Sequence, residues 1–463
     1  MIDSHIFRAY DIRGDVRTQL TPDAVFVIGR ALAAAHFPAG STLAIGRDVR
    51  THSPALAESL MRGLRMQGVH IVDLGEITTP MLYFALHASE YDGGVMITGS
   101  HNPVNDNGLK ICRKTSSFLG SDIQAIRAKT LEEIEPAAAE GGYSRRDISE
   151  AYVREIVSRV KPAGNLRVVI DAGNGVAGPY ARALAAHYAS DLVELYCEPD
   201  GNFPNHHPDP SVAKNMADCQ RAVREHGADI GLAFDGDGDR LGVVDRDGSI
   251  IPADRLIVLF AREILARRQG VSILGDVKCS KFTFDDIRAR GGVPVMCKTG
   301  HALIKAKIRE TDAALAGEMS GHFFFGDRWF GFDDALYAAA RILEIVQCSG
   351  GASLHELISD LPESCATPEL RIECPDDIKF RLASAMYDHY KDRYPTSDLD
   401  GARIDFPKGW ALIRASNTQP VIVARVEADS PASVREIIVD LNAEIARFGR
   451  ENNVQMNMIG EHV

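Results

Sequence analysis

Three aspartates separated by single glycines form the sharpest chemical signal in the chain, Asp235-Gly-Asp237-Gly-Asp239-Arg240. The glycines let a loop bend so that several carboxylate oxygens converge on one hard cation. Two carboxylates about 4 Å apart repel by about 4 kcal/mol at an effective dielectric of 20, so a cation is needed to hold them together. A solvated acidic turn is the alternative, whereas an EF-hand loop fails because Arg240 and Arg246 stand where Gly and Glu are required. The pattern favours a divalent metal site.

A second motif places a hydroxyl, an imidazole and an amine close together in the chain. Thr98-Gly-Ser100-His101-Asn-Pro103 follows an apolar run, and Lys110 comes shortly after it. The glycine and the proline bracket a tight turn, from which the Ser100 hydroxyl can project. A serine is a weak nucleophile unless a base, a metal or nearby cations assist it. A helix cap or turn residue is the more common role, and both interpretations stay open at this point.

Two further loops carry groups that bind anions and hydroxyls. Arg414-Ala-Ser-Asn-Thr418 offers a guanidinium, two hydroxyls and an amide, a set suited to phosphate oxygens, with a polar hairpin as the alternative. Glu318-Met-Ser-Gly-His322 combines a carboxylate, a hydroxyl and an imidazole, which can all bond sugar hydroxyls. Tyr10-Asp-Ile-Arg13-Gly is equally consistent with a structural turn, and His301 with a capping or core histidine.

A glycine-rich segment in mid-chain fits the dinucleotide-binding fingerprint. Gly173-Asn-Gly175-Val-Ala-Gly178 follows an expected strand and precedes an expected helix, and Glu198 lies twenty residues beyond the last glycine. The alternative is a glycine turn that lets strand and helix pack closely, with Pro179 at the start of the helix. We favour this structural explanation, because the fingerprint alone is prone to false positives.

Strand-length apolar runs alternate with helix-length amphipathic segments, which predicts α/β layers. Thr42–Gly46 and Arg167–Ile170 are expected strands, and each precedes an expected helix, near Pro54–Gln67 and near Pro179–His187. A loose internal repeat also appears, in which a strand ending in Gly or Asp is followed by a strand that runs into a polar loop. The three paired strands are Ala44–Asp48 with Gly94–Ser100, Val168–Asp171 with Ile230–Asp235, and Ile273–Asp276 with Ala314–Glu318. The repeat predicts three related α/β units.

The last part of the chain has a different pattern. Trp410–Arg414 and Val421–Val426 are expected strands around a polar loop, and a helix is expected at Pro431–Phe448. This predicts a smaller α+β domain, and 463 residues are enough for three or four domains. We place the domains at 1–147, 148–249, 250–361 and 362–463, each boundary being uncertain by several residues.

The composition narrows the class of protein. A net charge of −13 argues against a broad nucleic-acid surface, although a local basic pocket for phosphate remains compatible with it. The eight cysteines are scattered without a C-x-x-C pair and are expected to be reduced thiols. The start of the chain is too charged for a signal peptide, and no run of eighteen apolar residues occurs. We expect a cytoplasmic protein with no membrane and no nucleic-acid partner.

Taken together and in this order, the serine, triple-aspartate, Glu-Met-Ser-Gly-His and Arg-Ala-Ser-Asn-Thr loops resemble those of the α-D-phosphohexomutase family, over nearly the whole chain. Within that family, Tyr10-Asp-Ile-Arg-Gly and Gly317-Glu-Met-Ser-Gly-His322 are most similar to the bacterial phosphomannomutase/phosphoglucomutase group. The resemblance implies three related mixed α/β domains and a C-terminal α+β domain with an antiparallel sheet, arranged around a central cleft. Each domain would contribute one loop to that cleft.

The resemblance also implies residue roles. Ser100 would carry the phosphoryl group, and Asp235, Asp237 and Asp239 would bind one Mg²⁺ together with an oxygen of phosphorylated Ser100. Substrate would be bound by Tyr10, Lys278, His301, Glu318, Ser320, Arg414, Ser416, Asn417 and Thr418. The groups around the reacting atoms would be Arg13, His101, Lys110, Arg240 and His322, among which His322, His101 and Lys110 are candidates for moving the hydroxyl proton.

These parts predict a phosphohexomutase that interconverts hexose 1-phosphate and hexose 6-phosphate, with glucose and/or mannose as the sugar. A phosphoserine of charge about −1.5 to −2 beside three aspartates requires a metal, so the serine loop and the aspartate loop explain each other. A 1,6-bisphosphate would be the intermediate, with glucose 1,6-bisphosphate or an equivalent as activator, and the protein is expected to be a monomer. A phosphatase that forms an aspartyl phosphate and a non-catalytic sugar-phosphate or calcium-binding module are the two rival functions.

Overall fold

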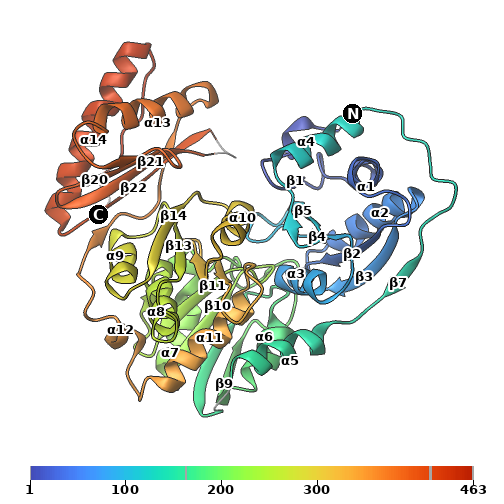
Figure 1. Cartoon of the computed structure of the whole chain (residues 1–463), viewed down its shortest axis with the longest axis horizontal. Helices are drawn as coiled ribbons and strands as arrows, with labels where there is room; N and C mark the ends of the chain where they lie inside the picture. Colours follow the sequence, from blue (N-terminus) through green and yellow to red (C-terminus); the bar gives the residue numbers. More distant parts are fainter. Residues whose placement is uncertain (1, 162–163, 417–419, 461–463) are drawn as a thin grey trace.

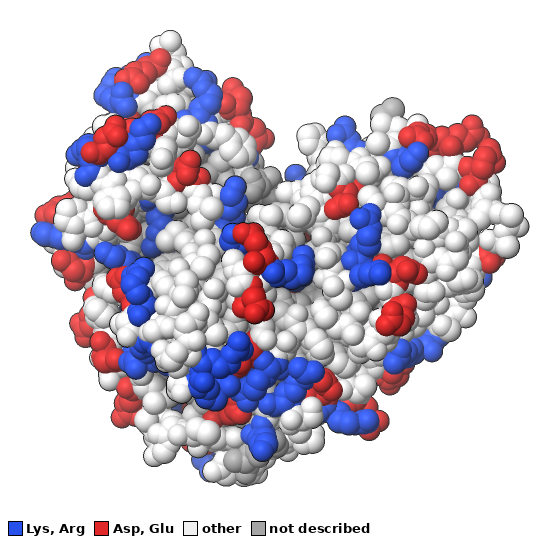
Figure 2. Space-filling view, viewed as in Figure 1, with Lys and Arg blue, Asp and Glu red and all other residues white. Residues whose placement is uncertain are grey.

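The computed structural model describes residues 2–161, 164–416 and 420–460, in which the chain forms four β-sheets with their helices. The four domains built on these sheets give the molecule a heart-shaped outline, with the first and the fourth domain as its two lobes (Figure 1). The space-filling view shows a notch between these lobes (Figure 2). Among the described helices, none is long and apolar enough to cross a membrane.

The first sheet is mixed, with a parallel centre and antiparallel strands on one side. Its strands lie in the order β1 (Ile12–Asp15), β5 (Asp106–Arg113), β4 (Gly93–Ile97), β2 (Thr42–Arg47), β3 (His70–Glu76) and β7 (Tyr143–Arg145), and β6 (Ser116–Ser117) pairs with β5. The helical segments of this domain are the 3₁₀ turn η1 (Ser4–Ile6), α1 (Pro22–His36), α2 (Ser53–Met66), α3 (Thr79–Ala88) and α4 (Gly120–Lys129).

The second and third sheets repeat this arrangement. The second has the order β12 (Ile250–Ile251), β11 (Leu241–Asp245), β10 (Ile230–Phe234), β8 (Leu166–Asp171) and β9 (Ala189–Leu195), with α5 (Ser149–Arg159), α6 (Gly178–Ala185), η2 (Ala213–Met216) and α7 (Ala217–His226). The third has the order β14 (Val293–Cys297), β13 (Ser272–Asp276), β15 (Leu315–Gly317) and β16 (Phe323–Phe325), with α8 (Ala253–Leu265), α9 (Lys281–Ala289), α10 (His301–Thr311), α11 (Ala335–Cys348) and α12 (Leu354–Leu357).

The same four-strand path occurs in all three of these sheets. In each, three parallel strands are followed by an antiparallel one: β3-β2-β4-β5, β9-β8-β10-β11 and β14-β13-β15-β16. The loop between the third and the fourth strand of the path is the serine loop in the first sheet, the aspartate loop in the second and the Glu318–His322 loop in the third. The predicted three related units are therefore confirmed, and each places its chemistry at the same topological position.

The fourth sheet is antiparallel throughout, as expected. Its order is β17 (Cys365–Ala366), β22 (Val421–Ala428), β21 (Gly409–Ala415), β20 (Ala402–Phe406) and β19 (Thr396–Ser397), while β18 (Leu370–Glu373) pairs with β22. The helices α13 (Asp376–Tyr390) and α14 (Pro431–Asn452) pack on it. The mixed α/β class with an antiparallel C-terminal domain is confirmed. The domain boundaries remain a prediction, and β12 lies just beyond the one placed at 249.

Local sequence explains where several helices begin. Thr21, Thr78 and Ser430 accept a backbone N–H in the first turn of α1, α3 and α14, and a proline stands in the first two positions of each helix. The predicted strands and helices recur within a few residues of their expected ends. Sequence patterns of this kind specify local elements well, because capping and apolar periodicity act over short distances.

The hydrophobic core joins the first three domains and leaves the fourth separate. One continuous buried cluster contains Met81 and Leu82 of the first domain, Val168 and Ile230 of the second and Phe323 of the third. The fourth domain has a core of its own, and a small cluster of Val277, Trp410 and Leu412 connects it to the third. Helix α11 packs against α5, α6 and α8, so it joins the second domain to the third.

Candidate active site

The serine loop presents Ser100 in a strained backbone conformation. Its φ is 48°, a left-handed value that is uncommon for a residue with a side chain. The Ser100 hydroxyl donates to Oδ2 of Asp235 at 2.8 Å and lies 2.9 Å from Nδ1 of His101. Ser100 is only 3% exposed. The loop therefore points its hydroxyl directly at the first of the three aspartates.

A buried arginine that the sequence reading missed holds this loop in place. Arg50 donates to four backbone carbonyls, those of Ser100, Asn102, Pro103 and Asp106, at 2.7 to 3.0 Å. Asp48 accepts the N–H of Gly99 at 3.0 Å. Asp48-Val-Arg50 follows β2, the parallel neighbour of β4, so both segments lie at the same edge of the sheet. This position could have indicated from the sequence that Asp48 and Arg50 support the serine loop.

The three aspartates lie in the loop between β10 and β11, and all are fully buried. Carboxylate oxygens of Asp235, Asp237 and Asp239 lie within 4.8 Å of one another. Oδ1 of Asp235 accepts the backbone N–H groups of Asp239 and Arg240 at 3.0 and 3.1 Å, which closes the loop. Within the described residues, Oδ1 of Asp237 accepts no hydrogen bond. A buried oxygen without a donor fits a cation ligand, and an all-oxygen set is what Mg²⁺ or Ca²⁺ prefers.

Lys110 is the ammonium group that neutralises part of this charge. Its Nζ donates to Oδ2 of Asp237 at 2.7 Å and to Oδ2 of Asp239 at 2.6 Å. Burial disfavours the charged amine, but the two carboxylates outweigh burial and raise the pKa of Lys110. Burial and the charges of Asp239 and Asp237 raise the pKa of Asp235 well above its ordinary value. Lys110, with His322 and Arg240, instead outweighs burial at Asp239 and lowers its pKa, so it is around Asp235 that positive charge is lacking, as expected of a site that takes a cation.

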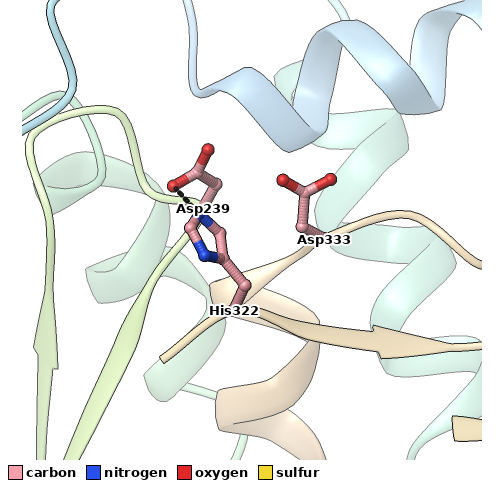
Figure 3. Close-up of side chains that lie close together, drawn as sticks. All are labelled: Asp239, His322 and Asp333. Carbon is pink, nitrogen blue, oxygen red and sulfur yellow. Dashed lines mark ion pairs between the residues drawn. The ribbon is translucent and has the colours of Figure 1, made fainter. Parts of the chain in front are cut away.

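The Glu318–His322 loop joins the aspartates through its histidine (Figure 3). His322 Nε2 lies 3.2 Å from Oδ1 of Asp239, and its Nδ1 lies 2.9 Å from Oε2 of Glu318 and 3.0 Å from the Ser320 hydroxyl. Burial disfavours the imidazolium, yet Asp239 outweighs burial and raises the pKa of His322 to about 10. Burial of Glu318 is likewise outweighed, by His322, which lowers the pKa of Glu318 to about 2. A charged pair of Glu318 and His322 thus connects the third domain to the three aspartates.

Asp333 is a second missed residue, and Figure 3 shows its carboxylate near Asp239 and His322. It is fully buried and lies between β16 and α11. Its oxygens are 3.0 Å from Lys305 Nζ and 3.5 Å from Nδ1 of His301. Sequence reading offered no signal for Asp333, because it follows an ordinary aromatic segment and belongs to none of the recognised loops.

The other predicted residues of the first three domains lie near this centre. Arg13 donates to Oδ1 of Asn102 in the serine loop at 2.7 Å. The Tyr10 ring packs edge-on against the His301 ring, with 6.0 Å between the ring centroids. Nη1 of Arg240 lies 3.8 Å from Oδ1 of Asp209. Nζ of Lys278 lies 3.5 Å from Oε2 of Glu369 in the fourth domain.

The fourth-domain loop is described in part. Arg414 is the last residue but one of β21, and its Nε lies 3.2 Å from Oδ2 of Asp400. The N–H of Ser416 donates to the carbonyl of Val421 at 3.0 Å. Asn417 and Thr418, which complete the predicted phosphate-binding set, lie outside the described residues. Burial raises the pKa of Tyr10 to about 12, and the charges of Glu318 and Arg414 also act on this group. Tyr10 therefore lies near both the Glu318–His322 loop and the fourth domain.

The glycine-rich segment of the second domain supports the aspartate loop. A Cβ at Gly178 would come 2.0 Å from the carbonyl oxygen of Cys197, so this glycine permits close backbone packing. The N–H of Val176 donates to the carbonyl of Gly236 at 3.2 Å, and His206 packs against Gly173. The contacts of these glycines with other parts of the chain agree with the structural explanation of the segment.

Four family models match successive parts of the chain. Models of phosphoglucomutase/phosphomannomutase alpha/beta/alpha domains I, II and III match residues 4–137, 150–248 and 252–365. The model of the C-terminal domain of phosphoglucomutase/phosphomannomutase matches residues 369–444.

Individual proteins resemble the chain along nearly its whole length. Phosphomannomutase/phosphoglucomutase of Pseudomonas aeruginosa is 45% identical over 438 residues, which cover 94% of either chain. Phosphoglucomutase of Neisseria gonorrhoeae is 45% identical over 444 residues, covering 94% of this chain and 95% of that protein. The crystal structure of a phosphoglucomutase/phosphomannomutase family protein from Burkholderia thailandensis is 41% identical and superposes with a TM-score of 0.90, covering 99% of this chain and 100% of that one.

Proposed function

The chain belongs to the phosphoglucomutase/phosphomannomutase family, and from this premise we propose that it interconverts hexose 1-phosphate and hexose 6-phosphate. Glucose and/or mannose is the sugar, and a 1,6-bisphosphate is the intermediate. The contact between the Ser100 hydroxyl and Asp235 carries the proposal, because it joins the expected phosphoryl carrier to the expected metal ligands across two domains.

Phosphorylated Ser100 starts the reaction. A sugar hydroxyl oxygen attacks phosphorus, the bond between phosphorus and Oγ of Ser100 breaks, and the hydroxyl proton passes to a base. The bisphosphate then turns end for end, and its other phosphoryl group returns to Ser100 with the proton moving in the opposite sense. Such a transfer requires positioning and charge stabilisation more than covalent chemistry. Lys110, Arg240 and Arg13 supply fixed positive charge around Ser100 in this scheme.

Mg²⁺ fits the aspartate cluster, with Asp235, Asp237, Asp239 and a phosphoserine oxygen as ligands, and when bound it neutralises charge on the transferring phosphoryl group. His322, His101 and Lys110 remain the candidates for the proton. All three already contact the serine or the aspartates, His101 through the Ser100 hydroxyl and the other two through Asp239. Glucose 1,6-bisphosphate or an equivalent charges the serine before the first turnover.

Substrate recognition is divided between the third and fourth domains. Glu318 and Ser320 bond the sugar hydroxyls, with His301, Lys278 and Tyr10 around them. Arg414 and Ser416, with Asn417 and Thr418, hold the phosphate that is not being transferred. One fixed site of this kind serves both orientations of the bisphosphate, since either one leaves a phosphate remote from Ser100. Domains at 1–147, 148–249, 250–361 and 362–463, a monomer and a cytoplasmic location complete the proposal.

The decisive experiment is one incubation of the protein with glucose 1-phosphate, Mg²⁺ and a trace of glucose 1,6-bisphosphate. The proposal expects glucose 6-phosphate, an aspartyl-phosphate phosphatase would release inorganic phosphate, and a binding module would leave the substrate unchanged. Ser100→Ala is expected to lose both turnover and the phosphate mass adduct. Ser116→Ala, at an exposed serine of the same domain, is the matched control. Full turnover of S100A would overturn the assignment.

A further inference from the structure

Asp400 lies at the contact between the third and fourth domains, beside the arginine expected to hold phosphate. Its Oδ2 accepts the backbone N–H of Thr299 at 3.2 Å, and the same oxygen lies 3.2 Å from Nε of Arg414. The side chains of Arg414 and Asp400 are only 12% and 15% exposed. The ion pair is therefore shielded from solvent more than a typical surface pair, and it is attached to the backbone of another domain.

The segment that Asp400 contacts also holds the sugar-recognition carboxylate. Thr299 donates its hydroxyl to Oδ2 of Asp276 at 3.2 Å, and the N–H of Gly300 donates to Oε1 of Glu318 at 2.7 Å. Gly300 has a φ of 129°, which only glycine adopts readily, and a Cβ there would lie 3.3 Å from the Tyr10 hydroxyl. One short segment before α10 thus contacts carboxylates of two domains and an aromatic ring of a third.

The chemistry of a guanidinium makes this arrangement useful for an anion. Arginine presents its donors as a planar fork, and a phosphate is held best by two parallel donors. The Asp400 carboxylate, 3.2 Å from Nε of Arg414, attracts the guanidinium by its charge and restricts where it lies, although Nε makes no hydrogen bond within the described residues. An arginine without such a partner loses more side-chain entropy when it binds.

We propose that Asp400 is a positioning residue that orients Arg414 for the phosphate that is not transferred and sets its place relative to Glu318. The proposal rests on the proposed function, because the phosphate and the sugar hydroxyls belong to one substrate. The distance between these two recognition points crosses a domain boundary, so neither domain sets it alone. Asp400 and Thr299 provide the connection, with Arg414 on one side and Gly300 and Glu318 on the other.

A double-mutant cycle tests whether Asp400 acts through Arg414. Asp400→Asn keeps the size of the side chain and removes its charge, and it is expected to raise KM for glucose 1-phosphate about 10-fold while kcat changes less than about 3-fold. In an Arg414→Ala background the same substitution is expected to change KM less than about 2-fold, because the group that it positions is gone. Asp400→Glu, which keeps the charge, is expected to recover part of the loss. Asp398→Asn, at an exposed aspartate two residues away, should behave as the wild type.

Equal effects of D400N in the wild-type and R414A backgrounds would overturn the proposal, because a merely structural residue acts independently of Arg414. An unchanged KM in D400N would overturn it as well. The phosphate mass adduct on Ser100 should be the same in D400N and wild type, which separates loss of phosphate recognition from loss of phosphoryl transfer. If the wild-type protein shows no turnover, the proposed function fails, and calorimetric titration of the same variants with glucose 1-phosphate still decides the role of Asp400.

Discussion

Two domain junctions of this molecule are built from opposite kinds of contact. Between the first and second domains, Ser100 meets Asp235, and Lys110 and Thr79 meet Asp237, so the groups that connect the domains are those expected to do the chemistry. Between the third and fourth domains, the Arg403 guanidinium lies 3.9 Å from the centre of the Trp410 ring and donates to the backbone carbonyls of Val277 and Cys279. Ser280 also donates to Glu427 at 2.7 Å.

The difference concerns what each junction needs from outside the chain. The first buries three carboxylates near one lysine, and the pKa of Asp235 stays raised by burial and by its two neighbouring carboxylates, so a bound cation should strengthen this junction. The second satisfies its buried Arg403 with neutral carbonyls and an aromatic face, so this part of the junction needs no ligand. A ligand-dependent contact therefore lies beside the proposed chemistry, whereas the contact of Arg403 that anchors the fourth domain does not depend on a ligand.

Removal of the metal should give the largest effect. Treatment of the full chain with EDTA is expected to lower mutase turnover by at least about 100-fold. Without the metal, no cation at the three aspartates neutralises the negative charge of the phosphoryl group. Added Mg²⁺ should restore turnover and raise the melting temperature, with about 2.7 kcal/mol of stabilisation at 100 times Kd. Undiminished turnover after chelation would contradict the metal assignment.

Lys110→Met should be next in size. It leaves Asp237 and Asp239 buried without their ammonium partner, and loss of one member of a buried pair costs about 3 to 5 kcal/mol of unfolding free energy. Chemical denaturation with and without Mg²⁺ measures the effect, and the metal should recover more stability in the variant than in the wild type. The control is Lys129→Met, since Lys129 pairs with Glu132 at the surface and should matter by less than about 0.5 kcal/mol.

Arg403→Met probes the other junction. It leaves two buried carbonyls without a donor and removes a stacked cation, which should cost about 2 to 3 kcal/mol of unfolding free energy. In contrast to Lys110→Met, the loss should be independent of Mg²⁺, and the Ser100 phosphate adduct should be unchanged in the mass spectrum. A loss that Mg²⁺ reverses would remove the distinction between the two junctions.

Thr79→Val should have the smallest effect. The hydroxyl of Thr79 donates to Oδ2 of Asp237 at 2.5 Å, but Lys110 bonds the same oxygen, so the carboxylate keeps a partner. The expected loss of unfolding free energy is about 1 kcal/mol, measured by denaturation. Thr130→Val, at an exposed hydroxyl, gives the baseline, and equal losses for the two variants would show that the contact with Asp237 contributes nothing.

Much of the architecture could be predicted from the sequence because its signals are local. The three strand pairs, the C-terminal strands around Arg414 and the capped helices each depend on residues within a few positions of one another. The loops that carry chemistry were recognisable for the same reason, since glycines, prolines and polar groups gather there at fixed offsets. The roles of the individual site residues remain predictions.

The sequence by itself determined the family, the mixed α/β repeat and the four loops expected to carry the chemistry. Only the tertiary structure decided which groups support those loops. Arg50 binds the carbonyl of Asp106, which is 56 residues further along the chain. Asp333 lies beside His322 but belongs to no motif. Asp400 accepts the N–H of Thr299, 101 residues before it. The packing of whole domains determines these partners, because a buried charged group needs a hydrogen-bond or ion-pair partner and the fold supplies one from a distant part of the chain. No local sequence pattern therefore predicts them.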